Sequence, residues 1–215
     1  MTRVKVCGLT NLQDALIAVE AGADLLGFIF YPPSPRSVTS ERARTIAEAV
    51  RDAGFPVRLV GVFVDESPDD VRKTVSRCGL DYAQLHGAES PGTVAALVDD
   101  GIAVIKAFRV RDGVSPGEMA RYRATAYLLD AYVAGKPGGT GRTFDWQLAV
   151  RAAGQFPVLL AGGLTPDNVA QAVRTVRPWG VDVASSVEAA PGRKDPDQVR
   201  RFVAAVRRAA EGDSP

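Results

Sequence analysis

The chain has 215 residues, the length of one ordinary domain. Its 26 Lys and Arg residues are balanced by 25 Asp and Glu residues, which argues against nucleic acid as a partner because nucleic-acid-binding surfaces usually carry a basic excess. Hydrophobic residues make up 46% of the chain, enough for a sizeable core. No apolar run reaches the ~18–20 residues that a membrane-spanning helix needs, so we expect no membrane partner.

Cysteine and histidine are scarce. Cys7 and Cys78 are too few and too far apart for a disulfide framework, and the single histidine, His86, almost excludes a histidine-rich metal site. The chain also begins without the apolar segment of a signal peptide. We therefore expect a cytoplasmic protein with reduced thiols and no bound metal.

Short β-branched runs alternate with longer helical stretches along the whole chain. Several of these runs are almost wholly apolar, which is typical of parallel strands buried on both faces. The expected strands are Arg3–Val6, Leu25–Phe30, Val57–Val64, Tyr82–Leu85, Ala103–Phe108, Tyr127–Asp130, Val158–Ala161 and Val181–Ala184.

Helix start and stop signals fall between these strands. Thr10 and Gln13 form a capping-box pattern. A capping residue stands before a proline, the favoured first residue of a helix, at Ser67, Ser90, Ser115, Thr165 and Asp195. Glycines expected to end helices are Gly22, Gly54, Gly79 and Gly101.

Eight strand–helix units of about 27 residues each predict a (β/α)₈ TIM barrel, with residues 1–215 as a single domain. The alternative is an open, doubly wound sheet, but the uninterrupted alternation favours the barrel. The fifth helix, near Pro116–Tyr122, has the weakest pattern. The glycine-rich loop Ala131–Thr143 is a candidate mobile lid.

The loops after the last two strands predict a phosphate site. In a TIM barrel the chemistry lies at the carboxyl ends of the strands, and the loops after strands seven and eight commonly bind phosphate. Gly162 and Gly163 follow strand seven, and Ser185 and Ser186 follow strand eight. Small residues let backbone N–H groups approach an anion. The competing interpretation is that the two glycines only form a tight turn.

Cys7 and Asp130 end strands one and six, which lie three positions apart around the ring, so the two side chains are expected to face each other across the barrel mouth. A thiol and a carboxyl in that arrangement suit a general base and a general acid. Cys7 is equally compatible with a small buried apolar residue, and Asp130 with a capping residue.

Other polar residues at strand ends have two interpretations each. Arg36, in a proline-stiffened loop, suits a fork onto a substrate carboxylate or a solvent-facing role. Gln84 and His86 either line the pocket or bond the backbone. Lys106 suits a Schiff base, but a structural ion pair fits better because no neighbour that would lower its pKa is identifiable.

Several segments at the strand ends form a recognisable set. They are Lys5–Thr10, Gly27–Pro32, Ser34–Arg36, Gln84–Gly87, Gly139–Gly141, Phe144–Trp146, Ala161–Leu164 and Asp182–Val183. In this order they resemble the phosphoribosylanthranilate isomerase family of tryptophan biosynthesis. The KVCGLT and SPR segments are specific, whereas AGGL alone is not.

The resemblance implies an Amadori rearrangement without a cofactor, from N-(5-phosphoribosyl)anthranilate to 1-(2-carboxyphenylamino)-1-deoxyribulose 5-phosphate. It implies that Cys7 is the general base and Asp130 the general acid. It further implies that Arg36 binds the anthranilate carboxylate and that Asp182 lies near the sugar. Gly163 and the loop after strand eight would hold the phosphate of this small phosphorylated substrate.

The loop after strand eight departs from the family pattern, which usually reads Asp-Val-Ser-Ser-Gly-Val-Glu. Here Ala184 replaces a serine and Ser186 replaces the glycine. With a negative φ, Ser186 is harmless and adds a hydroxyl donor to the phosphate; with a positive φ it is strained. We favour the harmless case.

A non-catalytic or differently specific phosphosugar-binding barrel is the alternative function. The pair formed by Cys7 and Asp130 argues against a barrel that only senses its ligand. The single histidine argues against a metal-dependent epimerase.

Overall fold

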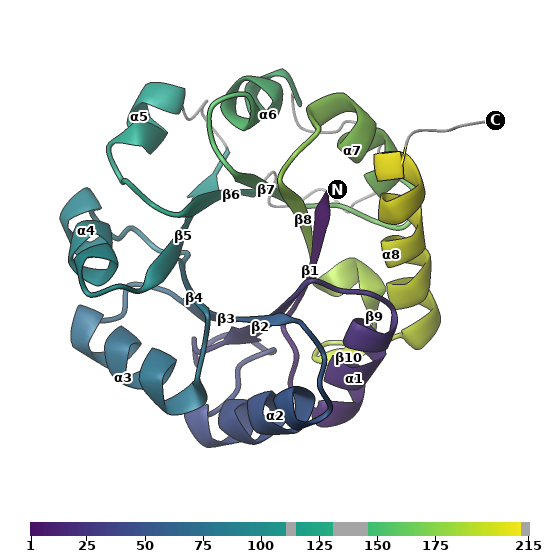
Figure 1. The fold of residues 1–215 in the computed structure, drawn as a ribbon, viewed down its shortest axis with the longest axis horizontal. Helices are drawn as coiled ribbons and strands as arrows, with labels where there is room; N and C mark the ends of the chain where they lie inside the picture. The colour runs from purple at the N-terminus through teal and green to yellow at the C-terminus, as the bar shows by residue number, and fades with distance from the viewer. Residues whose placement is uncertain (111–114, 131–145, 212–215) are drawn as a thin grey trace.

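Eight parallel strands close into a barrel in chain order, from β1 round to β8 and back to β1. The computed structural model describes residues 1–110, 115–130 and 146–211, and Figure 1 looks into the ring of strands. The strands are β1 Arg3–Cys7, β2 Leu25–Ile29, β3 Arg58–Phe63, β4 Tyr82–Leu85, β5 Ala103–Arg109, β6 Ala126–Asp130, β7 Val158–Ala161 and β8 Gly180–Val183. The predicted (β/α)₈ barrel is therefore confirmed, and the open sheet is excluded.

A helix follows each barrel strand, and together the helices form the outer ring in Figure 1. The fifth helix, with the weakest sequence pattern, is only five residues long. The helices are α1 Leu12–Glu20, α2 Ser40–Asp52, α3 Pro68–Cys78, α4 Pro91–Asp99, α5 Pro116–Ala120, α6 Trp146–Ala153, α7 Val169–Val176 and α8 Pro196–Glu211. None of the helices in the described part of the chain is long and apolar enough to cross a membrane.

Most predicted helix caps are confirmed. Ser67, Ser90 and Ser115 each accept a hydrogen bond from a backbone N–H in the first turn of the helix that follows. The backbone φ is positive at every glycine predicted to end a helix, a conformation that glycine adopts without strain.

Two predicted helix starts are wrong. Asn11, not Thr10, caps α1, because its side chain reaches the N–H of Asp14 while the Thr10 hydroxyl donates to Gly192 O at 2.6 Å. Thr165 does not begin α7 either. Its Oγ1 accepts from Asp167 N and Asn168 N, which makes a turn, and the helix starts only at Val169.

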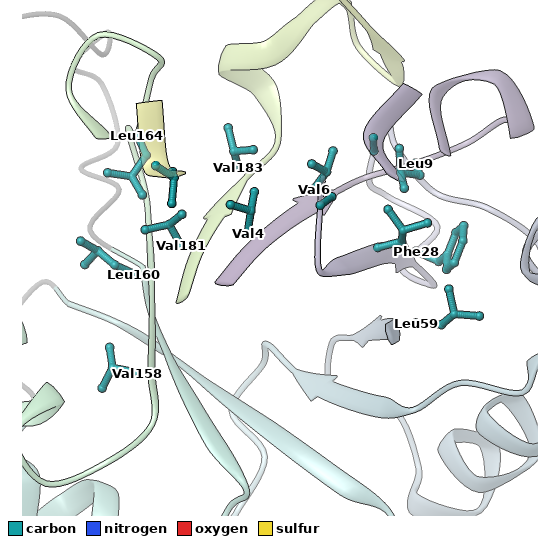
Figure 2. Close-up of a cluster of buried hydrophobic side chains, with 14 of the residues drawn as sticks. Val4, Val6, Leu9, Phe28, Leu59, Val158, Leu160, Leu164, Val181 and Val183 are labelled. Atoms are coloured by element: carbon teal, nitrogen blue, oxygen red, sulfur yellow. The ribbon is translucent and has the colours of Figure 1, made fainter. Parts of the chain in front are cut away.

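Strand alternation sorts the core into two layers. Outward-facing side chains such as Val4, Val6 and Val181 pack against the helices, and Figure 2 shows them together with Phe28 and Leu160. Inward-facing side chains fill the barrel, with a cluster of Leu25, Val60, Ile105, Ala107, Ala126, Leu128, Leu159 and Ala161. Lys5 and Cys7 alternate with Val4 and Val6 on β1, so they face into the barrel.

The chain between β8 and α8 is the most elaborate described connection. A short 3₁₀ turn, η1 Ser185–Val187, leads into a small antiparallel hairpin of β9 Glu188–Ala190 and β10 Arg193–Lys194. This hairpin lies beside α1 in Figure 1. The predicted lid, Ala131–Thr143, falls outside the described residues.

Candidate active site

A cavity of about 240 Å³ opens at the carboxyl end of the barrel, at the carboxyl ends of β1, β4, β6, β7 and β8. Its walls hold every residue predicted from sequence for the site except Arg36. They are Cys7, Gln84, His86, Asp130, Gly162, Gly163, Asp182, Ser185 and Ser186. The structure therefore brings together residues that lie up to 179 positions apart, from Cys7 to Ser186.

The Cys7 thiol lies at the bottom of the barrel mouth with 5% of the residue exposed. Its neighbour on β2 is Gly27, where a Cβ would come within 2.7 Å of Cys7 Sγ, so only glycine leaves room for the sulfur. Burial raises the pKa of the Cys7 thiol, and the charge of the Lys5 ammonium opposes that rise without cancelling it.

The opposite wall carries a short polar chain of side chains. Gln84 Nε2 lies 3.1 Å from His86 Nδ1, and His86 Nε2 lies 3.4 Å from Asp130 Oδ2. His86 and Asp130 each keep about a fifth of the side chain exposed, at 21%. Gln84 is 1% exposed, and its Oε1 has no hydrogen-bond partner among the described residues. A buried acceptor without a donor is costly, so this oxygen is ready for a donor on a ligand.

The two loops predicted to bind phosphate adjoin each other at the edge of the cavity. Gly162 and Gly163 have φ values of 85° and 69°, and a Cβ at Gly163 would meet no atom within 4 Å. Asn168 braces this loop by donating to Gly163 O at 2.9 Å. The Ser186 hydroxyl donates to Leu164 O at 2.5 Å and so ties the two loops together. Positive φ and open space at Gly163 leave the backbone accessible to an anion.

Ser186 is not among the residues with positive φ, so the backbone strain that a serine in place of glycine could carry is absent at this position. The hydroxyl is used differently from the prediction, however. Its proton goes to Leu164 O, and it is not left as a donor for a phosphate. This hydrogen bond links the loop after β8 to the loop after β7. Its two residues are 22 positions apart, so local sequence patterns did not predict it.

Arg36 lies outside the residues that line the cavity, but next to Cys7. Its Cδ would be 2.8 Å from a Cβ at Gly8, so the side chain crosses the chain directly after Cys7. The guanidinium forks onto Glu188, with Nη2 at 2.7 Å and Nε at 2.9 Å from the carboxylate oxygens. Glu188 also accepts from Lys194 Nζ at 2.9 Å. Burial raises the pKa of Glu188, but the bonds to Arg36 and Lys194 outweigh it and hold the pKa below its usual value.

Sequence reasoning missed three charged residues of this region: Lys5, Glu188 and Lys194. The signal for Lys5 was available, because a lysine at an inward position of an apolar strand needs a partner. Glu188 and Lys194 belong to the β9–β10 hairpin, which no periodicity predicted.

Lys106 is not in the cavity. Its ammonium is bonded to Glu89 Oε2 at 2.6 Å and to Gly87 O at 2.8 Å, which makes the structural ion pair that the sequence favoured over a Schiff base.

Fold and site together define the class of protein: a (β/α)₈ barrel with a thiol and a carboxyl in one cavity, whose rim is formed by the short loops after β7 and β8. The family model of N-(5'-phosphoribosyl)anthranilate isomerase matches residues 4–205. The chain belongs to this family.

Individual relatives agree with the family match. The chain is 53% identical over 210 residues to an N-(5'-phosphoribosyl)anthranilate isomerase of Citrifermentans bemidjiense, covering 98% of this chain and 99% of the relative. The solved phosphoribosyl anthranilate isomerase of Thermotoga maritima superposes with a TM-score of 0.84 at 43% identity, covering 99% and 100% of the two chains. Another solved isomerase, at 42% identity, a TM-score of 0.81 and coverage of 99% and 100%, was determined with reduced 1-(o-carboxyphenylamino)-1-deoxyribulose 5-phosphate bound.

Proposed function

We propose that this protein is the isomerase that converts N-(5-phosphoribosyl)anthranilate into 1-(2-carboxyphenylamino)-1-deoxyribulose 5-phosphate in tryptophan biosynthesis. The observation that carries the proposal is the single cavity that Cys7 and Asp130 share with the glycine-rich rim, in a chain of this family.

The reaction needs one acid and one base on different sides of the sugar. Asp130 protonates the furanose ring oxygen, so that the ring opens to an iminium. The thiolate of Cys7 then removes the C2 proton, and the resulting enolamine tautomerises to the ketone. General acid and base groups of this kind contribute about 10²–10⁴-fold each. His86, beside Asp130, lies where it can orient that carboxyl.

Substrate binding uses the remaining walls. The free acceptor of Gln84 suits a sugar hydroxyl, and Asp182 lies near enough to the same cavity for a second one. Backbone N–H groups of Gly162, Gly163, Ser185 and Ser186 suit the phosphate. Arg36, held beside Cys7 by Glu188, is placed to add a contact to the anthranilate carboxylate.

The test is a fluorescence assay that follows the loss of phosphoribosylanthranilate with and without the purified protein. We expect turnover with the wild type and almost none with the double variant Cys7→Ser/Asp130→Asn. A folded wild-type protein that binds the substrate but leaves its rate of loss unchanged is instead a phosphosugar-binding barrel without this activity.

A further inference from the structure

Lys5 is a buried charge that the reaction described above does not use. Its side chain has no exposed surface, and it stands two residues before Cys7 on the same inward face of β1. On the adjacent strand β8 its register partner is Asp182, and Lys5 Nζ donates to Asp182 Oδ1 at 2.9 Å. An ammonium buried without a partner is strongly disfavoured because it loses its hydration, so the bond to Asp182 holds the charge in place.

One carboxylate does not use all the donors of this ammonium. An ammonium has three N–H groups, and the other neighbour that acts on its pKa is the Cys7 side chain. Burial lowers the pKa of Lys5, but Asp182 and Cys7 raise it further than burial lowers it, so Lys5 stays charged. A charged ammonium therefore lies two residues from Cys7 on the same inward face of β1.

We infer that Lys5 is a positioning residue whose buried charge stabilises the Cys7 sulfur as an anion when the thiol gives up its proton, while Asp182 fixes the ammonium in place. The inference rests on the proposed function for its meaning in the reaction, because only the thiolate form of Cys7 can remove the C2 proton. The arrangement of Lys5, Asp182 and Cys7 stands without it.

The groups around Cys7 act in opposite directions on its pKa. Burial raises it most, the Lys5 charge lowers it, and the Asp182 carboxylate raises it by less than Lys5 lowers it. Lys194 lowers it slightly, from β10. Charged or titratable side chains face Cys7 from β1, β8, β10, the loop after β2 and the far wall of the cavity: Lys5, Asp182, Lys194, Arg36, Asp130 and His86.

The experiment measures the rate of alkylation of Cys7 by iodoacetamide against pH, without substrate, in a Cys78→Ser background so that one thiol reports. We expect Lys5→Met to move the midpoint upward by about one pH unit or more, which is about tenfold slower alkylation at pH 7. Asp182→Asn should move it downward. Lys106→Met, which removes a buried ammonium on the outer face of the barrel, should leave it unchanged.

Unchanged midpoints in both Lys5→Met and Asp182→Asn would overturn the inference and make Lys5 a structural ion-pair partner. If Lys5→Met does not fold, the double variant Lys5→Met/Asp182→Asn replaces it, because it leaves neither charge of the pair unpaired. Its alkylation midpoint should still lie above that of the wild type, since Lys5 lowers the pKa of Cys7 by more than Asp182 raises it. An unchanged midpoint in that variant would also overturn it.

Turnover supplies the second measurement. Lys5→Met should lower kcat at pH 7 by about tenfold, with KM little changed and with partial recovery at higher pH. A structural role would lower the melting temperature and the amount of active enzyme, with no recovery at higher pH. If the wild type shows no isomerase activity, the proposed function fails, but the alkylation midpoints still decide whether Lys5 controls Cys7.

Discussion

Two lysines are buried in strands of this barrel, and they lie in opposite surroundings. Lys106 on β5 points outward, between the inward-facing Ile105 and Ala107, and donates to Glu89 Oε2, Gly87 O and Leu85 O. Lys5 on β1 points inward and shares its charge between Asp182 and Cys7. Both ammonium groups are almost completely shielded from water.

The partners decide what each lysine does. Glu89 is itself saturated, since it also accepts from Gly87 N at 2.9 Å and Asp65 N at 3.0 Å. Because its donors and acceptors are bonded to one another, this network fixes the loops after β3 and β4. Asp182 and Cys7, the neighbours of Lys5, line the cavity instead. The face of the strand that carries each lysine therefore decides whether its neighbours lie in the outer loops or in the cavity.

The largest effect is expected on the inner face. Cys7→Ser and Asp130→Asn should each lower kcat by about 10²–10⁴-fold, because a hydroxyl is a far weaker base than a thiolate and an amide cannot supply the ring-opening proton. The melting temperature should change little. The measurement is steady-state turnover with circular dichroism as the control for folding, and near-normal kcat in either variant would remove that residue from the reaction.

A substitution on the outward face of β5, at Lys106, should instead affect stability and hardly affect activity. Lys106→Met leaves the Glu89 carboxylate buried without its cation, so we expect a loss of about 3–5 kcal/mol in the free energy of unfolding and little change in kcat of the folded enzyme. Denaturant unfolding measures the first quantity and active-site-normalised turnover the second. A large fall in kcat with unchanged stability would reverse the comparison.

The ion pair of Lys106 and Glu89 also predicts how the free energy of unfolding changes in acid. Burial raises the pKa of Glu89, but bonds from Lys106 and from backbone N–H groups outweigh it and hold the pKa below its usual value. A lowered pKa stabilises the fold above the pKa of the unfolded chain, about 4.3, and the stabilisation disappears as pH falls through the lower folded value. Lys106→Met should therefore lose less stability than the wild type between about pH 5 and pH 3. Parallel losses in the two proteins would contradict this.

Arg36, in the loop after β2, should give a binding effect of intermediate size. If Arg36 clamps the substrate carboxylate, Arg36→Met should raise KM with kcat nearly unchanged, by about 1.5–3 kcal/mol or roughly 10–150-fold. Arg44→Met, at an exposed arginine of α2 that pairs only loosely with Glu48 at 3.8 Å, is the matched control and should not change KM. An unchanged KM in Arg36→Met would leave Arg36 with the Glu188 ion pair alone.

The smallest effect is expected at the hydrogen bond between Ser186 and Leu164, which links the loops after β7 and β8. Ser186→Ala removes the bond to Leu164 O and should cost about 0.5–1.5 kcal/mol of stability. Inhibition by inorganic phosphate should hardly change, because the hydroxyl proton is already used within the protein. A strong loss of phosphate inhibition at normal stability would show that the hydroxyl turns to the ligand.

Sequence patterns predicted the barrel and the strand ends well, because parallel strands buried on both faces leave apolar runs with sharp ends. Cys7 and Asp130 were identifiable from their place at those ends. The partners were not: Arg36 with Glu188, Ser186 with Leu164 and Lys5 with Asp182 meet only when the ring closes. Contacts between residues 22 to 177 positions apart have no local periodicity to reveal them.

Gly27 limits which substitutions the protein can accept at position 7. Since the sulfur of Cys7 fills the space where a side chain at position 27 would begin, the two positions share one volume across neighbouring strands. Whether a substitution is tolerated at one of these positions therefore depends on the residue at the other, and any side chain as large as cysteine at position 7 requires glycine at position 27. The size of the side chain at position 7 is thus limited by Gly27 on β2, a residue to which we assign no step of the reaction.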